Sequence, residues 1–316
     1  MTDNLNGKPR EPGARLMRSA ALGLLLLAAL TSGCSVRNYA VNSVGDALAA
    51  SGSSFATDYD PELIRGAAPF SLKLMESILS EAPRHAGLLA AASSGFTQYA
   101  YAFVQQDADE AEARDVAAAR ALRNRARGLY HRARDYGLRA LDARHPGWRA
   151  QFDTDAKSAL ARLSRDDSPR LYWTTVAWAA AVALSKDSPR AIADLRLVDL
   201  MVGRLRELDP DMDHGALHAF LVSYEMGRPG ARNPETQARQ HFDQAVRLSA
   251  GQKAGPFVAL AESVSVAAQN RGEFVALLER AIRIDPSARP EWRLENTIMQ
   301  RRARWLLTQA DQLFLD

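Results

Sequence analysis

The stretch Leu278-Glu279-Arg280-Ala281-Ile282-Arg283-Ile284-Asp285-Pro286 decides the fold of this chain. Its residues favour a helix, and Asp285-Pro286 ends that helix because proline cannot continue it. The small side chain of Ala281 allows a second helix to approach closely. The stretch therefore predicts a helix that ends at Asp285 and packs against a neighbouring helix.

The same helix ending recurs along the chain. It is found at Ser80-Glu81-Ala82-Pro83, Ala143-Arg144-His145-Pro146 and Glu207-Leu208-Asp209-Pro210, and at Ala245–Ala250, where Ala250 replaces the proline. Successive endings lie 63, 64, 40 and 36 residues apart, and a tetratricopeptide helix pair takes about 34 residues. Two intervals thus match one pair and two are near double units. The endings resemble the tetratricopeptide repeat, although its Trp, Gly and Tyr are missing at most positions.

Helical signals also fill the segments between these endings. Ser168-Pro169, Ser188-Pro189 and Asn233-Pro234 each place a capping side chain before a proline, an order that starts helices. Residues 109–144 and 291–314 have high helix propensity, and strand alternation is absent from the sequence pattern. We predict an all-α fold for residues 61–316, a tetratricopeptide-like helix-pair repeat array (α-solenoid).

Composition and charge exclude several classes of protein. The 316 residues are 47% hydrophobic and 24% charged, with 14 Pro and 1 Cys, which is unlike a disordered, collagen-like or disulfide-rich chain. The formal charge is +3, of which the first 33 residues hold +2, so that 283 residues carry +1. Nucleic acid binding needs a dense basic footprint. We therefore expect no nucleic acid partner.

The first 33 residues have the pattern of a secretory signal peptide. A basic stretch ends at Arg18, and the apolar run Ala20–Leu30 follows. As a helix this run spans about 16 Å, roughly half of the hydrocarbon thickness of a membrane. We predict a signal peptide at residues 1–33 rather than a permanent membrane helix.

The end of this segment, Leu30-Thr31-Ser32-Gly33-Cys34, resembles the lipobox of bacterial lipoproteins, although Thr31 stands where the lipobox usually has Leu. The resemblance implies acylation of Cys34, and several acyl chains hold a protein firmly on a membrane. The alternative is a free thiol at Cys34 near an ordinary cleavage site. Ser35, in place of an Asp that resembles an inner-membrane retention signal, favours the periplasmic leaflet of the outer membrane. Residues 34–60 are then a lipidated tether.

Catalytic motifs are missing from the sequence. It has no G-x-S-x-G elbow, no phosphate-binding loop and no G-x-G-x-x-G. His214 and His218, four residues apart, would share one face of a helix and could hold zinc. However, Gly215 replaces the Glu of the metalloprotease pattern, and no third ligand is indicated. We expect packing roles for both histidines, no enzymatic activity, no metal and no cofactor.

Two aromatic groups and one basic run have alternative interpretations. The aromatic groups are core residues, or they line an apolar groove or passage for a ligand or partner. The candidate groove residues are Phe96, Tyr99, Tyr172, Trp173 and Trp178. The basic run is a solvated face, or it contacts lipid headgroups or an acidic partner. It consists of Arg120, Arg123, Arg125, Arg127, Arg132 and Arg134.

Five stretches resemble the TatT component family of TRAP transporters. They are Pro69–Glu76, Gly95–Phe103, Ala183–Asp187, Asp213–His218 and Pro290–Asn296. The resemblance implies a periplasmic lipoprotein of tetratricopeptide-like helix pairs that binds the solute-binding protein of a tripartite ATP-independent transporter. It also implies a homo-oligomer such as a trimer, with an internal passage for ligand. The alternative is a general scaffold lipoprotein for cell-envelope assembly, which explains the anchor and the repeats equally well.

Overall fold

The computed structural model describes residues 41–50 and 52–315. The chain divides into two units, Met1–Val44 and Gly45–Asp316. In the first unit the described residues 41–44 are helical. The helices named below belong to the second unit.

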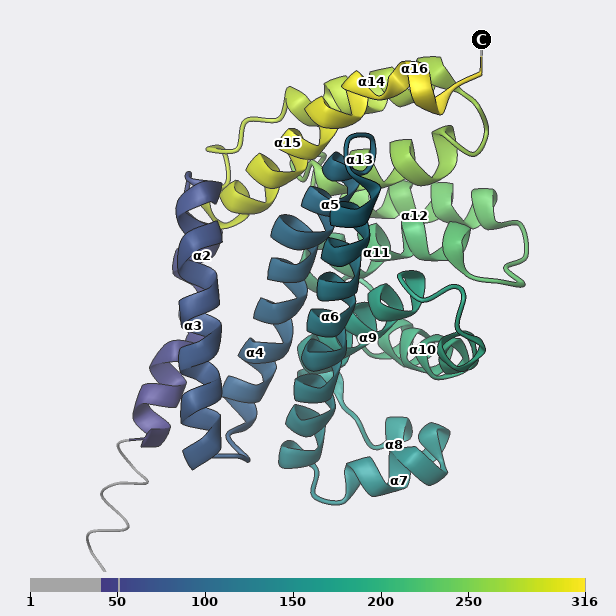
Figure 1. Cartoon of the computed structure of the whole chain (residues 1–316). Helices are drawn as coiled ribbons and strands as arrows, with labels where there is room; N and C mark the ends of the chain where they lie inside the picture. Colours follow the sequence, from purple (N-terminus) through teal and green to yellow (C-terminus); the bar gives the residue numbers. More distant parts are fainter. Residues whose placement is uncertain (1–40, 51, 316) are drawn as a thin grey trace, which may run out of the picture. The chain divides into compact units, whose positions relative to one another are not determined.

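Every regular element in the described part of the second unit is a helix, which confirms the all-α prediction (Figure 1). The α-helices are α2 (Gly52–Ala56), α3 (Pro61–Glu81), α4 (Ala86–Tyr99), α5 (Gln106–Glu112), α6 (Val116–Arg144), α7 (Trp148–Thr154), α8 (Ala156–Ala161), α9 (Ser168–Ala183), α10 (Pro189–Leu208), α11 (Met212–Gly227), α12 (Pro234–Leu248), α13 (Gly255–Leu260), α14 (Arg271–Ile282), α15 (Arg293–Thr308) and α16 (Ala310–Leu313). Two segments are π-helical, η1 (Ala100–Gln105) and η3 (Ala261–Ser265), and two are 3-10 helical, η2 (Arg165–Asp167) and η4 (Pro290–Trp292).

The predicted helix endings are helix ends in the structure. Helices α3, α6, α10 and α14 each end within a few residues before the proline of their motif, at Glu81, Arg144, Leu208 and Ile282. Helix α12 ends at Leu248, and Ala250 with its φ of 51° turns the chain in place of a proline. Local sequence therefore sets where these helices stop.

The predicted helix starts are correct in position but only partly in mechanism. Ser188 caps α10, since its hydroxyl accepts the backbone N–H of Ala191 at 3.4 Å. Asn233 has a left-handed φ of 49° and makes no side-chain cap bond. Ser168 lies inside α9, and the 3-10 turn before it is closed instead by Ser164 and Asp167, which cap each other's backbone. Proline marks all three starts, whereas the expected cap forms at one.

Part of the predicted tether is helical. Residues 45–50 and α2 are helices within the range 34–60. Leu48 packs against the cluster that contains Leu72 and Leu88, and Phe55 packs against Ile64. The helical fold thus begins before residue 61, because these apolar side chains find partners on later helices.

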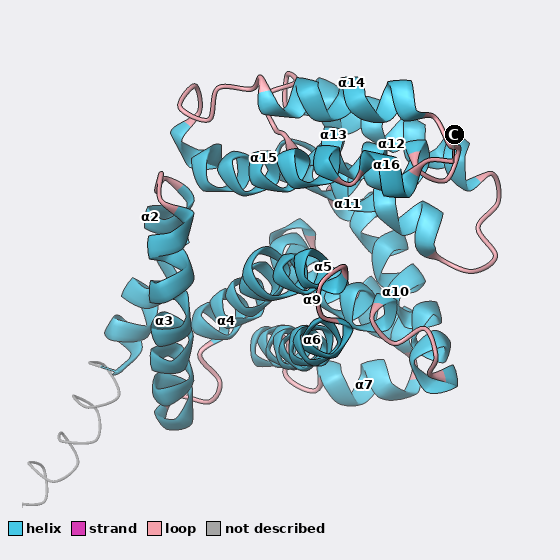
Figure 2. Cartoon of the chain, turned by 45° about the horizontal axis from the view of Figure 1, so that its top comes forward, coloured by secondary structure: helices cyan, strands magenta, loops and turns pink. Residues whose placement is uncertain are grey.

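The helices pack in a series that returns to its beginning. Helix α3 packs on α4, α4 on α6, α6 on α9 and α9 on α10; α11 packs on α12 and α13, α13 on α14, and α14 on α15. Helix α15 then contacts α2 and α3, as Figure 2 shows. Helix length varies from 29 residues in α6 to 7 in α7. A regular repeat within this series stays a prediction.

Candidate functional site

A cavity of about 1150 Å³ lies among the helices of the Gly45–Asp316 unit. Residues of α3, α4, η1, α9, α11 and α15 form much of its wall. Apolar side chains such as Ile64, Phe220 and Ile298 dominate this wall. Small-molecule sites commonly measure roughly 300–1,000 Å³ and are mostly apolar. The cavity is therefore large enough for an organic ligand.

The five candidate groove residues separate into two groups. Tyr99, Tyr172 and Trp173 line the cavity. Phe96 instead belongs to the core, where its ring stacks on Tyr136 with the ring centres 5.8 Å apart. Trp178 is also a core residue, and its indole N–H donates to a carboxylate oxygen of Asp194 at 3.0 Å.

Tyr172 is held in place by its hydroxyl group. The hydroxyl donates to the backbone carbonyl of Ala216 at 3.3 Å, which joins α9 to α11 at the cavity wall. Burial raises the pKa of the Tyr172 phenol. The phenol therefore stays protonated and keeps donating, so its ring is a fixed part of the wall.

All five stretches that carry the family resemblance contribute to the cavity wall. They are far apart in the sequence, and the helix series brings them together. One lining residue from each stretch is Leu72, Tyr99, Lys186, His214 and Trp292 in turn. The resemblance thus maps onto one cavity rather than onto scattered packing positions.

One region of the wall is polar. Lys253 is buried, and its ammonium nitrogen lies 3.5 Å from a carboxylate oxygen of Asp213 and 3.4 Å from one of Glu295. The same nitrogen lies 5.3 Å from the centre of the Trp292 ring. All four residues line the cavity. A buried cation, two carboxylates and an indole ring therefore meet at this part of the wall.

The prediction that His214 and His218 share one helix face is wrong. Asp213, His214 and Gly215 have left-handed φ angles of 42°, 54° and 92°, so regular helix geometry starts after them. His214 turns toward the ring of Trp292, with the ring centres 5.1 Å apart. His218 pairs with His241 of α12 through their Nδ1 atoms at 2.9 Å. Among the described residues, no three potential His, Cys, Asp or Glu ligands are grouped to hold a metal ion.

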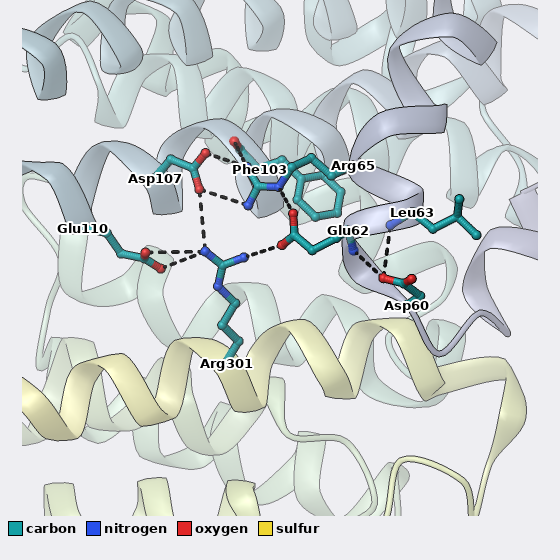
Figure 3. Close-up of polar contacts among 8 residues, drawn as sticks. All are labelled: Asp60, Glu62, Leu63, Arg65, Phe103, Asp107, Glu110 and Arg301. Atoms are coloured by element: carbon teal, nitrogen blue, oxygen red, sulfur yellow. Dashed lines mark hydrogen bonds and ion pairs between the residues drawn. The ribbon is translucent and has the colours of Figure 1, made fainter.

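A network of ion pairs joins α3 and α5 to α15 beside the cavity (Figure 3). The Arg301 guanidinium lies 2.9 Å from a carboxylate oxygen of Glu62 and 3.4 Å from one of Glu110. Arg65 binds Asp107 at 2.5 Å, and this hydrogen bond raises the pKa of Arg65. The network fastens the first long helix to the last one.

The basic run on α6 does not form a single solvated face. Arg123 pairs with Glu112 and Asp109, and Arg132 pairs with Glu76 at 3.1 Å. The guanidinium of Arg134 lies 5.1 Å from the centre of the Trp178 ring. Part of the run therefore stabilises the fold.

Two predictions concern the amino-terminal region. Cys34 and the signal peptide lie outside the described residues. Within the described ranges, none of the helices combines the length and apolar character needed to cross a membrane.

The family model for the TRAP transporter T-component matches residues 57–314. This chain belongs to that family. It is also 28% identical, over 326 aligned positions, to an uncharacterized protein of Treponema pallidum (strain Nichols), and the alignment covers 97% of this chain and 100% of that protein.

Membership in the TRAP transporter T-component family confirms the resemblance seen in the sequence. The family is a component of a transporter and is not known as an enzyme family. Of the residues at the polar wall, Asp213 and Glu295 lie in stretches that carried the resemblance. Lys253 was missed, because a single lysine in a loop has no sequence signal. The Arg301 network was missed because its partners are more than 190 residues away.

Proposed function

We propose that this chain is a lipid-anchored periplasmic T-component that binds the solute-binding subunit of a TRAP transporter and helps to transfer its ligand. The family match over residues 57–314 carries the proposal. The cavity supports it, because nearly all of its wall comes from the same residues. A preformed apolar cavity suits a ligand that passes between proteins without meeting bulk water.

The anchor has a physical role in this proposal. Acyl chains on Cys34 would confine the chain to the periplasmic face of a membrane, with the outer membrane favoured over the inner. Confinement raises the effective concentration of a partner that binds on the same membrane, even when the direct affinity is modest. Assembly into a homo-oligomer such as a trimer would add further binding sites on the same surface.

The experiment compares the full chain with the Cys34→Ser variant in cells that express the cognate solute-binding subunit. The wild-type chain should incorporate a fatty-acid analogue, sediment with membranes and retain the subunit when it is purified. The variant should lose the fatty-acid label and the membrane association while it still binds the subunit. Continued labelling of the variant would contradict the anchor. Absence of the subunit from both purifications would instead favour the general scaffold for envelope assembly.

A further inference from the structure

The polar wall of the cavity holds a buried cation that its neighbours satisfy only loosely. Lys253 is 4% exposed. Its ammonium nitrogen has three oxygen contacts, with the Asp213 carboxylate, the Glu295 carboxylate and the Asp213 backbone carbonyl, at 3.5, 3.4 and 3.4 Å. Charge-assisted hydrogen bonds are normally about 2.7–2.9 Å long. The three N–H donors of this ammonium are therefore under-used.

The two carboxylates face outward as well as toward Lys253. The side chains of Asp213 and Glu295 are 62% and 46% exposed, and both line the cavity. A molecule in the cavity can therefore reach the ammonium and both carboxylates from one side. The apolar wall next to them would hold the rest of such a molecule.

The backbone keeps Asp213 in this position. Asp213 and His214 both have left-handed φ angles, which cost free energy in residues other than glycine. Gly215 follows, and a side chain there would meet the backbone of Ala245 at 3.1 Å. Tight packing of this turn on α12 thus fixes a conformation that presents Asp213 to Lys253.

We propose that this wall binds the zwitterionic head group of an apolar α-amino acid. The ligand carboxylate would accept hydrogen bonds from Lys253, and the ligand ammonium would donate to Asp213 and Glu295. A head group with one positive and one negative charge leaves the net charge of the wall unchanged. A ligand with only a carboxylate would face two carboxylates, and one with only an ammonium would face Lys253. The inference rests on the proposal that the cavity takes the transporter's ligand.

The test is calorimetric titration of the purified full chain with L-phenylalanine, phenylpropionate and phenethylamine. The last two probes lack the ammonium and the carboxylate, respectively. The preparation must be free of detergent, because an apolar cavity would admit it. Phenylalanine should bind about tenfold more tightly than either other probe, as expected for the loss of one charge-assisted hydrogen bond.

Two variants assign the head-group contacts. Lys253→Met should weaken phenylalanine and phenylpropionate about tenfold. Because this change alters a buried residue, the half-exposed Glu295→Gln variant gives a second reading: it should weaken phenylalanine and phenethylamine but not phenylpropionate. Glu291→Gln is the matched control, since Glu291 also lines the cavity but pairs with Arg289 at 3.7 Å. The control should bind all three probes as the wild type does.

Equal affinity for the three probes would overturn the inference. So would tightest binding of a singly charged probe, or no heat of binding for phenylalanine at about 1 mM. Binding of the solute-binding subunit is measured separately on the same preparation. If the subunit binds and phenylalanine does not, the head-group assignment is wrong and the proposed function stands.

Discussion

Gly137 shows how one residue sets the spacing of the central helices. It lies on α6 where this helix meets α4 and α9, and a methyl group there would overlap the Thr174 hydroxyl and lie 2.9 Å from the Ser93 hydroxyl. Thr174 also donates to the Arg170 carbonyl at 2.6 Å, so it cannot turn away without losing that bond. We expect Gly137→Ala to lower the free energy of unfolding by about 1–3 kcal/mol.

The matched control for this change is Gly128→Ala on the same helix. A methyl group at Gly128 would meet nothing within 4 Å. Alanine has the higher helix propensity, so the control should gain about 0.5–1 kcal/mol. Chemical denaturation of both variants measures the two free energies. Equal effects at the two glycines would show that helix propensity, not close approach, determines the result.

The His218 and His241 pair should make stability depend on pH. Burial and the nearby His218 lower the pKa of His241 to about 4, and burial lowers the pKa of His218. The unfolded chain, with histidine pKa values of about 6.5, takes up protons first as the pH falls. Stability is therefore fully present above about pH 6.5 and decreases toward pH 4, by about 2 kcal/mol from His241.

Thermal unfolding between pH 7 and pH 5 measures this effect. Asp211, Arg206 and Arg247 also act on the pair, so the comparison must be with a variant that changes one ring only. We expect His241→Gln to have a smaller loss of melting temperature over this range than the wild type. Parallel curves for the two proteins would be evidence that the pair does not titrate as described.

At the scale of helices, the Arg301 network should stabilise the contact between α3 and α15. Arg301 is 39% exposed, so each of its ion pairs is screened by water. We expect Arg301→Gln to cost about 1 kcal/mol at low salt. The cost should shrink in about 1 M salt, where the screening length is about 3 Å. Arg304→Gln, an exposed change on the same helix, is the control for denaturation at both salt concentrations. A cost for Arg301→Gln that does not depend on salt would contradict an electrostatic origin.

Helix ends were predictable from the sequence because they depend on neighbouring residues. Pro83 and Pro286 stop helices through their own covalent structure, wherever the helices pack. The conformation at Asp213 and His214 was not predictable, because packing of Gly215 on another helix imposes it. Local rules place helices along the chain, and tertiary contacts decide the exceptions.

At the scale of the whole Gly45–Asp316 unit, the cavity separates residues that look alike in the sequence. Trp173 and Trp178 are on one helix, yet only Trp173 lines the cavity. Hydrophobicity is the same for both, and the difference comes from the positions of α10 and α11. The aromatic groups were therefore found from sequence, whereas their division into core and wall required the structure.

The most direct test of the central claim is sedimentation of the purified full chain with its cognate solute-binding subunit in an analytical ultracentrifuge. The two proteins should form a faster-sedimenting complex at tens of micromolar, corresponding to a binding free energy of about −6 to −7 kcal/mol. The complex should form with or without solute. Independent sedimentation of the two proteins at these concentrations would contradict the proposed role in the transporter.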